Sequence, residues 1–196
     1  DLKDNGAGTF QFTLNMSKSK TKIASILKMK TINGRPVPTQ TEIARKVKEI
    51  ESVLKAHPGI GNVTSRLDME NYIATVRCTF DKVENLNKAA RKIAEKQKAK
   101  PGDIKDNYAY QAASKVFLRL ANFSLKAEYN KLSNADKEIF SGATYTGIMR
   151  FEKPITSVSN KKSKLSSDKK AVMLNESVLD IITNKQTIAN TITLTK

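Results

Sequence analysis

The chain has 196 residues, and its 35 Lys and Arg residues outnumber 19 Asp and Glu, giving a formal net charge of +16 at pH 7. This length allows one large domain or two small ones, and a hydrophobic fraction of 39% is sufficient for a folded core. The single Cys excludes an internal disulfide, a Cys-based zinc site and an iron–sulfur cluster. The single His excludes any site that needs two within one chain.

The first predicted strand covers residues 9–16, where polar and apolar side chains alternate. One face, which we assign to the core, carries Phe10, Phe12, Leu14 and Met16. A Lys-rich stretch of short amphipathic turns follows over 17–37. Thr39 or Thr41 then caps a helix that ends at His57-Pro58-Gly59. Its apolar stripe consists of Ile43, Val47, Ile50 and Leu54.

The next segment predicts a hairpin, a second helix and a further strand. Its strands cover 62–69 and 72–80, and Asp81 caps a helix over 82–99 that ends at Pro101-Gly102. The buried stripe of this helix is expected to contain Val83, Leu86, Ala90 and Ile93. The further strand lies within 108–120, most clearly at Val116, Leu118 and Leu120. The order βαββαβ predicts an α+β fold with a ferredoxin-like antiparallel sheet and helices on one face.

The C-terminal part predicts a β-rich extension. Its expected elements are helices over 124–131, 133–142 and 178–182, strands over 145–151, 171–174 and 188–194, and a polar Lys/Ser-rich turn region over 157–170. We divide the chain into an N-terminal tether (1–8), a ferredoxin-like unit (9–121) and a C-terminal helix and strand extension (122–196). The extension is expected to pack on the same unit and form one composite domain.

The residue types that carry chemistry have ordinary structural explanations. His57 lies where a cation complements the C-terminus of a helix, and Cys78 lies on an apolar strand face. Residues 59–65 are similar to a phosphate loop, but they run from a helix into a strand, so we interpret them as a helix stop and turn. The sequence therefore predicts no catalytic residue, no metal ligand and no cofactor site.

The charge raises the possibility of nucleic-acid binding. Of the 35 basic residues, 28 are Lys, and they are dispersed along the chain. The predicted open face of the sheet carries Thr9, Gln11, Thr13, Asn15, Ile73, Thr75, Arg77 and Thr79. An RNA-recognition module needs aromatic residues there to stack on bases, and this face has none. Binding through Lys contacts to the nucleic-acid backbone stays as an alternative.

The opening residues 1–8 are polar, contain Gly and begin without Met, so we expect that an N-terminal segment has been removed. This start, the pair of segments 57–63 and 71–76, and the run from Phe151 to Val172 resemble the mature domain of uncharacterised bacterial lipoproteins of the Bacteroidetes type. The resemblance implies a lipid-bearing Cys immediately before residue 1. It supplies no activity and no binding residues.

We therefore expect a non-enzymatic, secreted, lipid-anchored envelope protein that acts as a binding or structural module. Its expected location is outside the cytoplasm, at the bacterial outer membrane or in the periplasm. The candidate partners are an unknown envelope protein, an anionic lipid or a glycan, and nucleic acid is the weaker alternative. No apolar run reaches the length of about 18 residues that a membrane-spanning helix needs, so contact with the membrane is expected through the lipid anchor.

Overall fold

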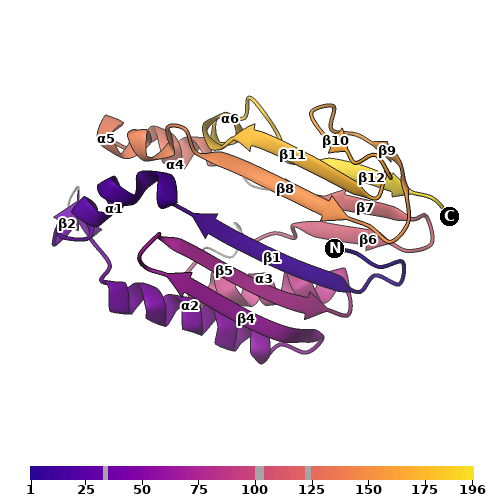
Figure 1. Cartoon of the computed structure of the whole chain (residues 1–196), viewed down its shortest axis with the longest axis horizontal. Helices are drawn as coiled ribbons and strands as arrows, with labels where there is room; N and C mark the ends of the chain where they lie inside the picture. Colours follow the sequence, from indigo (N-terminus) through magenta and orange to yellow (C-terminus); the bar gives the residue numbers. More distant parts are fainter. Residues whose placement is uncertain (33–34, 100–103, 122–124) are drawn as a thin grey trace. The chain divides into compact units, whose positions relative to one another are not determined.

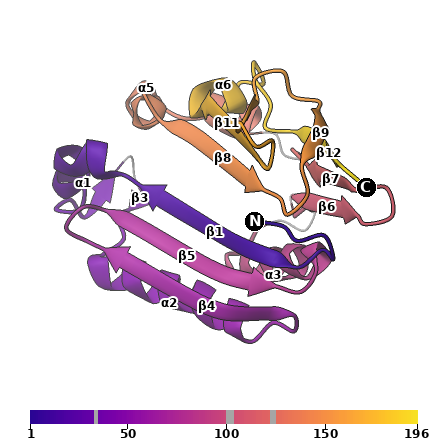
Figure 2. The ribbon, with the colours of Figure 1, turned by 45° about the vertical axis from the view of Figure 1, so that its right-hand side comes forward.

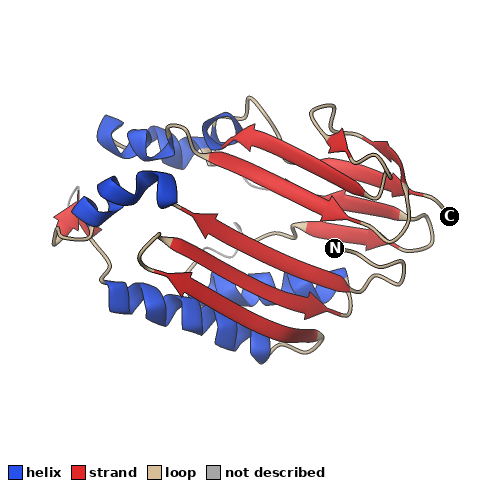
Figure 3. Cartoon of the chain, viewed as in Figure 1, coloured by secondary structure: helices blue, strands red, loops and turns tan. Residues whose placement is uncertain are grey.

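The computed structural model describes residues 1–32, 35–99, 104–121 and 125–196. The chain divides into two compact units. The small unit is Thr9–Asp81, and the large unit combines Asp1–Gly8 with Lys82–Lys196. Each unit contains helices and antiparallel strand pairs, which are blue and red in Figure 3. The predicted α+β class is therefore confirmed.

The small unit is built on a three-stranded sheet. Its strands are β1 (Gly8–Asn15), β4 (Ile60–Asp68) and β5 (Ile73–Phe80). They are hydrogen-bonded in the order β1-β5-β4 (Figure 1), so β1 and β4 form the edges. The turn between β4 and β5 is closed by Asp68, whose carboxylate accepts hydrogen bonds from the backbone N–H and the side-chain amide of Asn71, each at 2.9 Å. The predicted strands and turn are confirmed here.

Helix α2 (Gln40–Lys55) covers one face of this sheet, as Figures 1 and 2 show, and packs mainly on β4. Thr39 caps it, because its hydroxyl accepts from the Glu42 N–H and the Glu42 carboxylate accepts from the Thr39 N–H. These bonds to Thr39 lower the pKa of Glu42. The core beneath the helix contains Val53, Leu54, Val63, Cys78 and Phe80.

The Lys-rich segment after β1 forms short elements. They are the 3-10 helix η1 (Ser17–Ser19), helix α1 (Lys20–Ile26) and the paired strands β2 (Thr31–Ile32) and β3 (Arg35–Pro36). Neither η1 nor α1 contains a buried residue. The segment therefore adds little to the core of the small unit.

The assignment of all of the apolar face of β1 to the core is wrong at its C-terminal half. The exposed fractions of three residues on this face are large: 55% for Phe12, 45% for Leu14 and 38% for Met16. The alternation itself is correct, since Thr13 Oγ1 lies 3.2 Å from Thr75 Oγ1 on the opposite face of the sheet. The reason for the exposure is that α2 packs on β4 and β5 and leaves the edge strand β1 uncovered on that side.

The large unit contains two further sheets (Figure 2). One has the order β6-β7-β12-β9, with β6 (Tyr108–Gln111), β7 (Val116–Arg119), β12 (Asn190–Leu194) and β9 (Ile155–Val158). The other has the order β10-β11-β8, with β10 (Lys164–Leu165), β11 (Ala171–Ser177) and β8 (Thr144–Arg150). The core of the unit includes Phe117, Phe151, Ile155, Val172, Leu174, Ile192 and Leu194. The Phe117 and Phe151 rings pack edge to face, with 5.5 Å between their ring centroids.

Short helices and one longer helix complete the large unit. They are α3 (Val83–Lys96), α4 (Lys126–Asn130), α5 (Asn134–Lys137), the 3-10 helix η3 (Glu138–Phe140) and α6 (Val178–Ile182). The N-cap of α3 is Lys82 rather than the predicted Asp81, and the predicted stop at Pro101-Gly102 lies outside the described residues. Buried Asn87 connects α3 to β6, because its amide donates to the Tyr108 carbonyl at 2.6 Å.

The structure does not confirm the fourth strand of the predicted ferredoxin-like sheet. The segment 108–120 forms the hairpin β6–β7, and β7 pairs with β12, which comes from the C-terminal end of the chain. The small compact unit ends at Asp81, and the hairpin β6–β7 belongs to the large unit. Strand β7 includes Val116 and Leu118, where the sequence most clearly predicts a strand, and its buried residues are Phe117 and Arg119.

The N-terminal segment 1–8, predicted as a tether, is hydrogen-bonded to the end of β8 at Leu2. Leu2 is buried, and its N–H donates to the Arg150 carbonyl at 2.8 Å. Asp4 pairs with Lys115 at 2.7 Å, and this contact lowers the pKa of Asp4 and raises that of Lys115. The buried Leu2 side chain, its backbone hydrogen bond to Arg150 and the Asp4–Lys115 ion pair together hold the start of the chain in the large unit.

Candidate functional site

The residues singled out in the sequence lie apart from any reactive arrangement. His57 follows the end of α2, and its Nδ1 lies 2.8 Å from the Pro58 carbonyl oxygen. Cys78 is fully buried and free, and burial raises the pKa of its thiol, which disfavours the reactive thiolate. Among the residues that the structure describes, no three His, Cys, Asp or Glu side chains group closely enough to hold a metal ion.

The predicted helix stop and turn lies at residues 56–59, and residues 60–65 of the segment 59–65 belong to strand β4. The chain leaves α2, passes through Gly59 at a φ of +79° and enters β4 at Ile60. A phosphate loop instead leads into a helix whose first N–H groups face the anion. The segment therefore lacks the geometry of a phosphate site.

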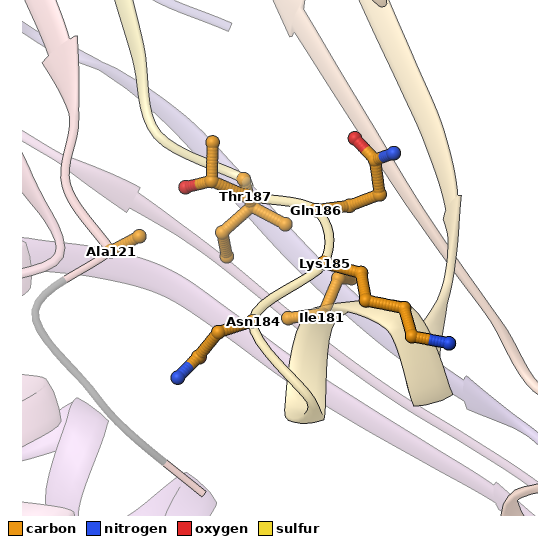
Figure 4. Close-up of a pocket in the computed structure, with 7 residues that line it drawn as sticks. Ala121, Ile181, Asn184, Lys185, Gln186 and Thr187 are labelled. Atoms are coloured by element: carbon orange, nitrogen blue, oxygen red, sulfur yellow. The ribbon is translucent and has the colours of Figure 1, made fainter. Parts of the chain in front are cut away.

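A hollow of about 360 Å³ lies in the large unit beside the loop that joins α6 to β12 (Figure 4). It is lined by Ala121, Ile181, Asn184, Lys185, Gln186, Thr187 and Ile188. Figure 4 shows that the polar ends of Asn184 and Lys185 point in different directions. Because polar groups must converge on a ligand to recognise it, this hollow is a weak candidate.

The strongest candidate is a lysine-rich segment of the large unit, residues 159–170, which we call the lysine hairpin. It comprises the loop after β9, strand β10 and the turn into β11. Five of its twelve residues are Lys, and one, Asp168, is acidic. All five ammonium groups belong to exposed residues, and none forms an ion pair with a carboxylate in the described part of the chain; they are Lys161, Lys162, Lys164, Lys169 and Lys170.

Asn190 holds the first half of the lysine hairpin. Its side chain is only 2% exposed, and its amide oxygen accepts from the N–H groups of Ser159 and Asn160 at 3.1 and 3.0 Å. Its amide nitrogen donates to Ser163 Oγ at 2.9 Å. Asn160 in turn donates to the carbonyl oxygens of Thr187 and Ala189. A buried side chain thus fixes the loop that carries Lys161 and Lys162.

Asp168 closes the turn of the lysine hairpin through hydrogen bonds. Its carboxylate accepts from Ser166 Oγ at 2.5 Å and from the Lys170 N–H at 3.0 Å. These bonds, the first of them above all, lower the pKa of Asp168. Ser166 Oγ also accepts from the Ala171 N–H at 2.9 Å. Hydrogen bonds fix the Asp168 carboxylate in the turn, and with five lysines and one acidic residue the segment keeps a net charge of +4 for a ligand.

The open face of the small-unit sheet is a second polar surface. The sequence predicted its threonines and Arg77, and Gln11, Thr13 and Arg77 are exposed. The strand register shows that Arg66 also belongs to this open face. Arg66 lies opposite Thr75, and Thr64 lies opposite Arg77, so the side chains of all four residues are on the same side of the sheet. The two arginines therefore project from neighbouring strands on one face. Alternation within the second strand was the signal that could have identified Arg66.

Comparisons with known proteins supply no assignment. No protein-family model matches the chain, and no match is found among curated proteins or solved structures. Within the described ranges, no helix combines the length and apolar character needed to cross a membrane. The function must therefore be argued from the surfaces themselves.

Sequence reasoning identified the lysine excess but missed the residue that organises it. Asn190 lies some twenty residues beyond the lysine hairpin, in a Thr- and Ile-rich strand that gives no sign of a polar contact. The one sequence feature that could have pointed to Asn190 is its place at the start of a predicted strand, next to the alternating apolar residues Ile188, Ile192 and Leu194. That pattern is common in turns, so it predicts no partner.

Proposed function

We propose that the chain is a non-enzymatic binding module of the bacterial cell envelope that holds a polyanionic ligand on its lysine hairpin. The observation that carries the proposal is the group of five exposed lysines, without carboxylate partners in the described structure, on a segment fixed by hydrogen bonds. Unpaired cations on a preorganised segment bind anionic groups with little loss of conformational freedom. Anionic glycans and lipid headgroups are the ligand classes that fit.

The proposed location is the periplasm or the outer membrane, with a lipid anchor attached immediately before Asp1. The resemblance to Bacteroidetes-type lipoproteins supports this location. Reading the precursor gene tests it directly. A signal peptide that ends in Cys just before Asp1 is expected, and an open reading frame that begins near Asp1 without such a peptide would refute the anchor.

Replacing all five lysines of the hairpin by glutamine should weaken binding to heparin, a soluble polyanionic glycan, by about 10- to 100-fold at low salt. The substitutions remove five charges from a surface that we expect to contact the ligand, and they lower the net charge from +16 to +11. Isothermal titration calorimetry at two salt concentrations measures the change.

The matched control has five exposed lysines of the small unit changed to glutamine, which produces the same net charge. The control positions are Lys18, Lys22, Lys28, Lys30 and Lys46. We expect this variant to keep its heparin affinity within about threefold, because all five lysines of the proposed contact segment stay in place. Equal losses in the two variants would show that net charge, and not the lysine hairpin, binds the glycan.

A second candidate is a nucleic-acid-binding module that acts through backbone contacts on the open face of the small-unit sheet. Exposed Arg66 and Arg77 on neighbouring strands, surrounded by threonine hydroxyls, favour it. The strand order β1-β5-β4 with α2 on one face supports a ferredoxin-like arrangement for this unit, with the C-terminal strands as an extension. Such an arrangement leaves the other face of the sheet open to a ligand.

If this candidate is correct, Arg66→Gln with Arg77→Gln should reduce the slope of log K against log salt for random duplex DNA by about two. The control, Arg45→Gln with Lys46→Gln on exposed positions of α2, removes the same charge and should leave the slope unchanged. Filter binding over a salt series gives both slopes. An unchanged slope in the first variant would exclude the open face as the DNA contact.

A further inference from the structure

The outer face of the β10-β11-β8 sheet combines exposed apolar and cationic side chains. The strand register places Lys164 opposite Met173, and Met173 opposite Ile148, so that these three residues form one row across the sheet. Ile148 and Met173 are 46% and 36% exposed. In the described strands this face has no acidic residue; it carries Thr144, Thr146, Ile148, Arg150, Lys164, Ala171, Met173, Asn175 and Ser177.

The first residue of the chain lies at the edge of this same face. Arg150 is on the outer face opposite Ala171, and its guanidinium lies 3.6 Å from the Asp1 carboxylate. The Phe151 N–H donates to the carbonyl of Lys170, the last residue of the lysine hairpin, at 2.8 Å. A lipid anchor attached before Asp1, as proposed, would therefore emerge from the protein beside the lysines and beside the exposed apolar pair, Ile148 and Met173.

The mixture of side chains discriminates between kinds of anionic ligand. A glycan or a nucleic acid in water offers charge to the lysines but no apolar phase for Ile148 and Met173. The headgroup region of a bilayer offers both, because phosphates lie at its surface and acyl chains lie just beneath. Burying exposed apolar side chains at that boundary adds to the electrostatic attraction.

We infer that the outer face of the β10-β11-β8 sheet, together with the lysine hairpin, docks on the surface of an anionic phospholipid bilayer. This inference rests on the proposed polyanion-binding function and names its ligand. The lysines contact the headgroup phosphates, and Ile148 and Met173 enter the boundary between headgroups and acyl chains. The module then lies with this face toward the membrane that holds its anchor.

Vesicle flotation of the unanchored 196-residue chain tests this inference. The vesicles are phosphatidylcholine alone or phosphatidylcholine mixed with phosphatidylglycerol, each at low and at high salt. We expect flotation with the mixed vesicles at low salt only. The pair Ile148→Ser and Met173→Ser should lower the partition coefficient for mixed vesicles by about tenfold, the equivalent of losing roughly 50–60 Å² of buried apolar surface, and should keep heparin affinity unchanged.

The control is Phe12→Ser with Leu14→Ser, an exposed apolar pair on β1 in the small unit, which should float like the unmodified chain. Circular dichroism verifies that each variant is folded. Flotation of the Ile148→Ser, Met173→Ser variant at the unmodified level would overturn the inference. Heparin binding by the unmodified chain without flotation would overturn it and leave the proposed function standing. Failure to bind heparin as well as vesicles would remove the proposed function itself.

Discussion

Replacing Leu54 with alanine should lower the free energy of unfolding by about 2–5 kcal/mol. Leu54 is 5% exposed and lies in the last turn of α2, on the side that packs on β4. Together with Val53 it supplies the buried apolar surface of this helix. Truncation to alanine removes apolar contacts and leaves a cavity, which the sheet on the other side fills only in part.

Urea unfolding followed by circular dichroism measures this change. Because the chain has two compact units, hydrogen exchange of the α2 and β4 amides is needed to assign the loss to the small unit. Lys48→Ala, on the exposed face of the same helix, is the control and should change the free energy by less than about 0.5 kcal/mol. A loss of less than half a kcal/mol in the Leu54 variant would show that α2 does not pack on the sheet through this residue.

The elements of the small unit could be predicted because local rules determine them. Thr39 and Glu42 form a capping box that depends on a spacing of three residues, and the helix stops at a Pro-Gly pair. The hairpin turn depends on Asp68 and Asn71, whose hydrogen bonds also span only three residues. Each of these signals lies within one turn of the chain, where sequence alone specifies the partner.

Pairing between distant strands was not predictable in the same way. Alternation in 108–120 indicates a strand, but it does not specify that β7 pairs with β12, more than seventy residues later. The same limit explains β1, where alternation correctly grouped Phe12, Leu14 and Met16 on one face. It could not reveal that α2 would leave the edge strand uncovered.

For the candidate site, too, the sequence predicts the composition of the surface but not how its side chains are arranged. The lysine excess of 159–170 is visible in the sequence, and so is the exposure that Lys favours. That hydrogen bonds from Ser166 and the Lys170 N–H fix the Asp168 carboxylate follows only from the folded turn. The alignment of Lys164, Met173 and Ile148 requires the register of three strands.

Asn190→Ala should destabilise the large unit by about 2–4 kcal/mol, a large effect for one polar side chain. Its buried amide oxygen accepts from the Ser159 and Asn160 N–H groups, and its removal leaves these donors without their partner. Asn175→Ala is the matched control. Asn175 lies on the neighbouring sheet, is exposed and donates to Thr146 Oγ1, so its loss should cost less than about 1 kcal/mol.

The same variant separates the arrangement of the lysine hairpin from its charge. Asn190→Ala leaves all five lysines in place, but it frees the loop that carries Lys161 and Lys162. Amide exchange across 159–163 should become faster, and heparin affinity should fall by roughly threefold, because the loop must then be ordered on binding. If exchange accelerates while affinity stays constant, binding depends on the number of lysines alone. If exchange does not change, Asn190 is not the residue that holds the loop.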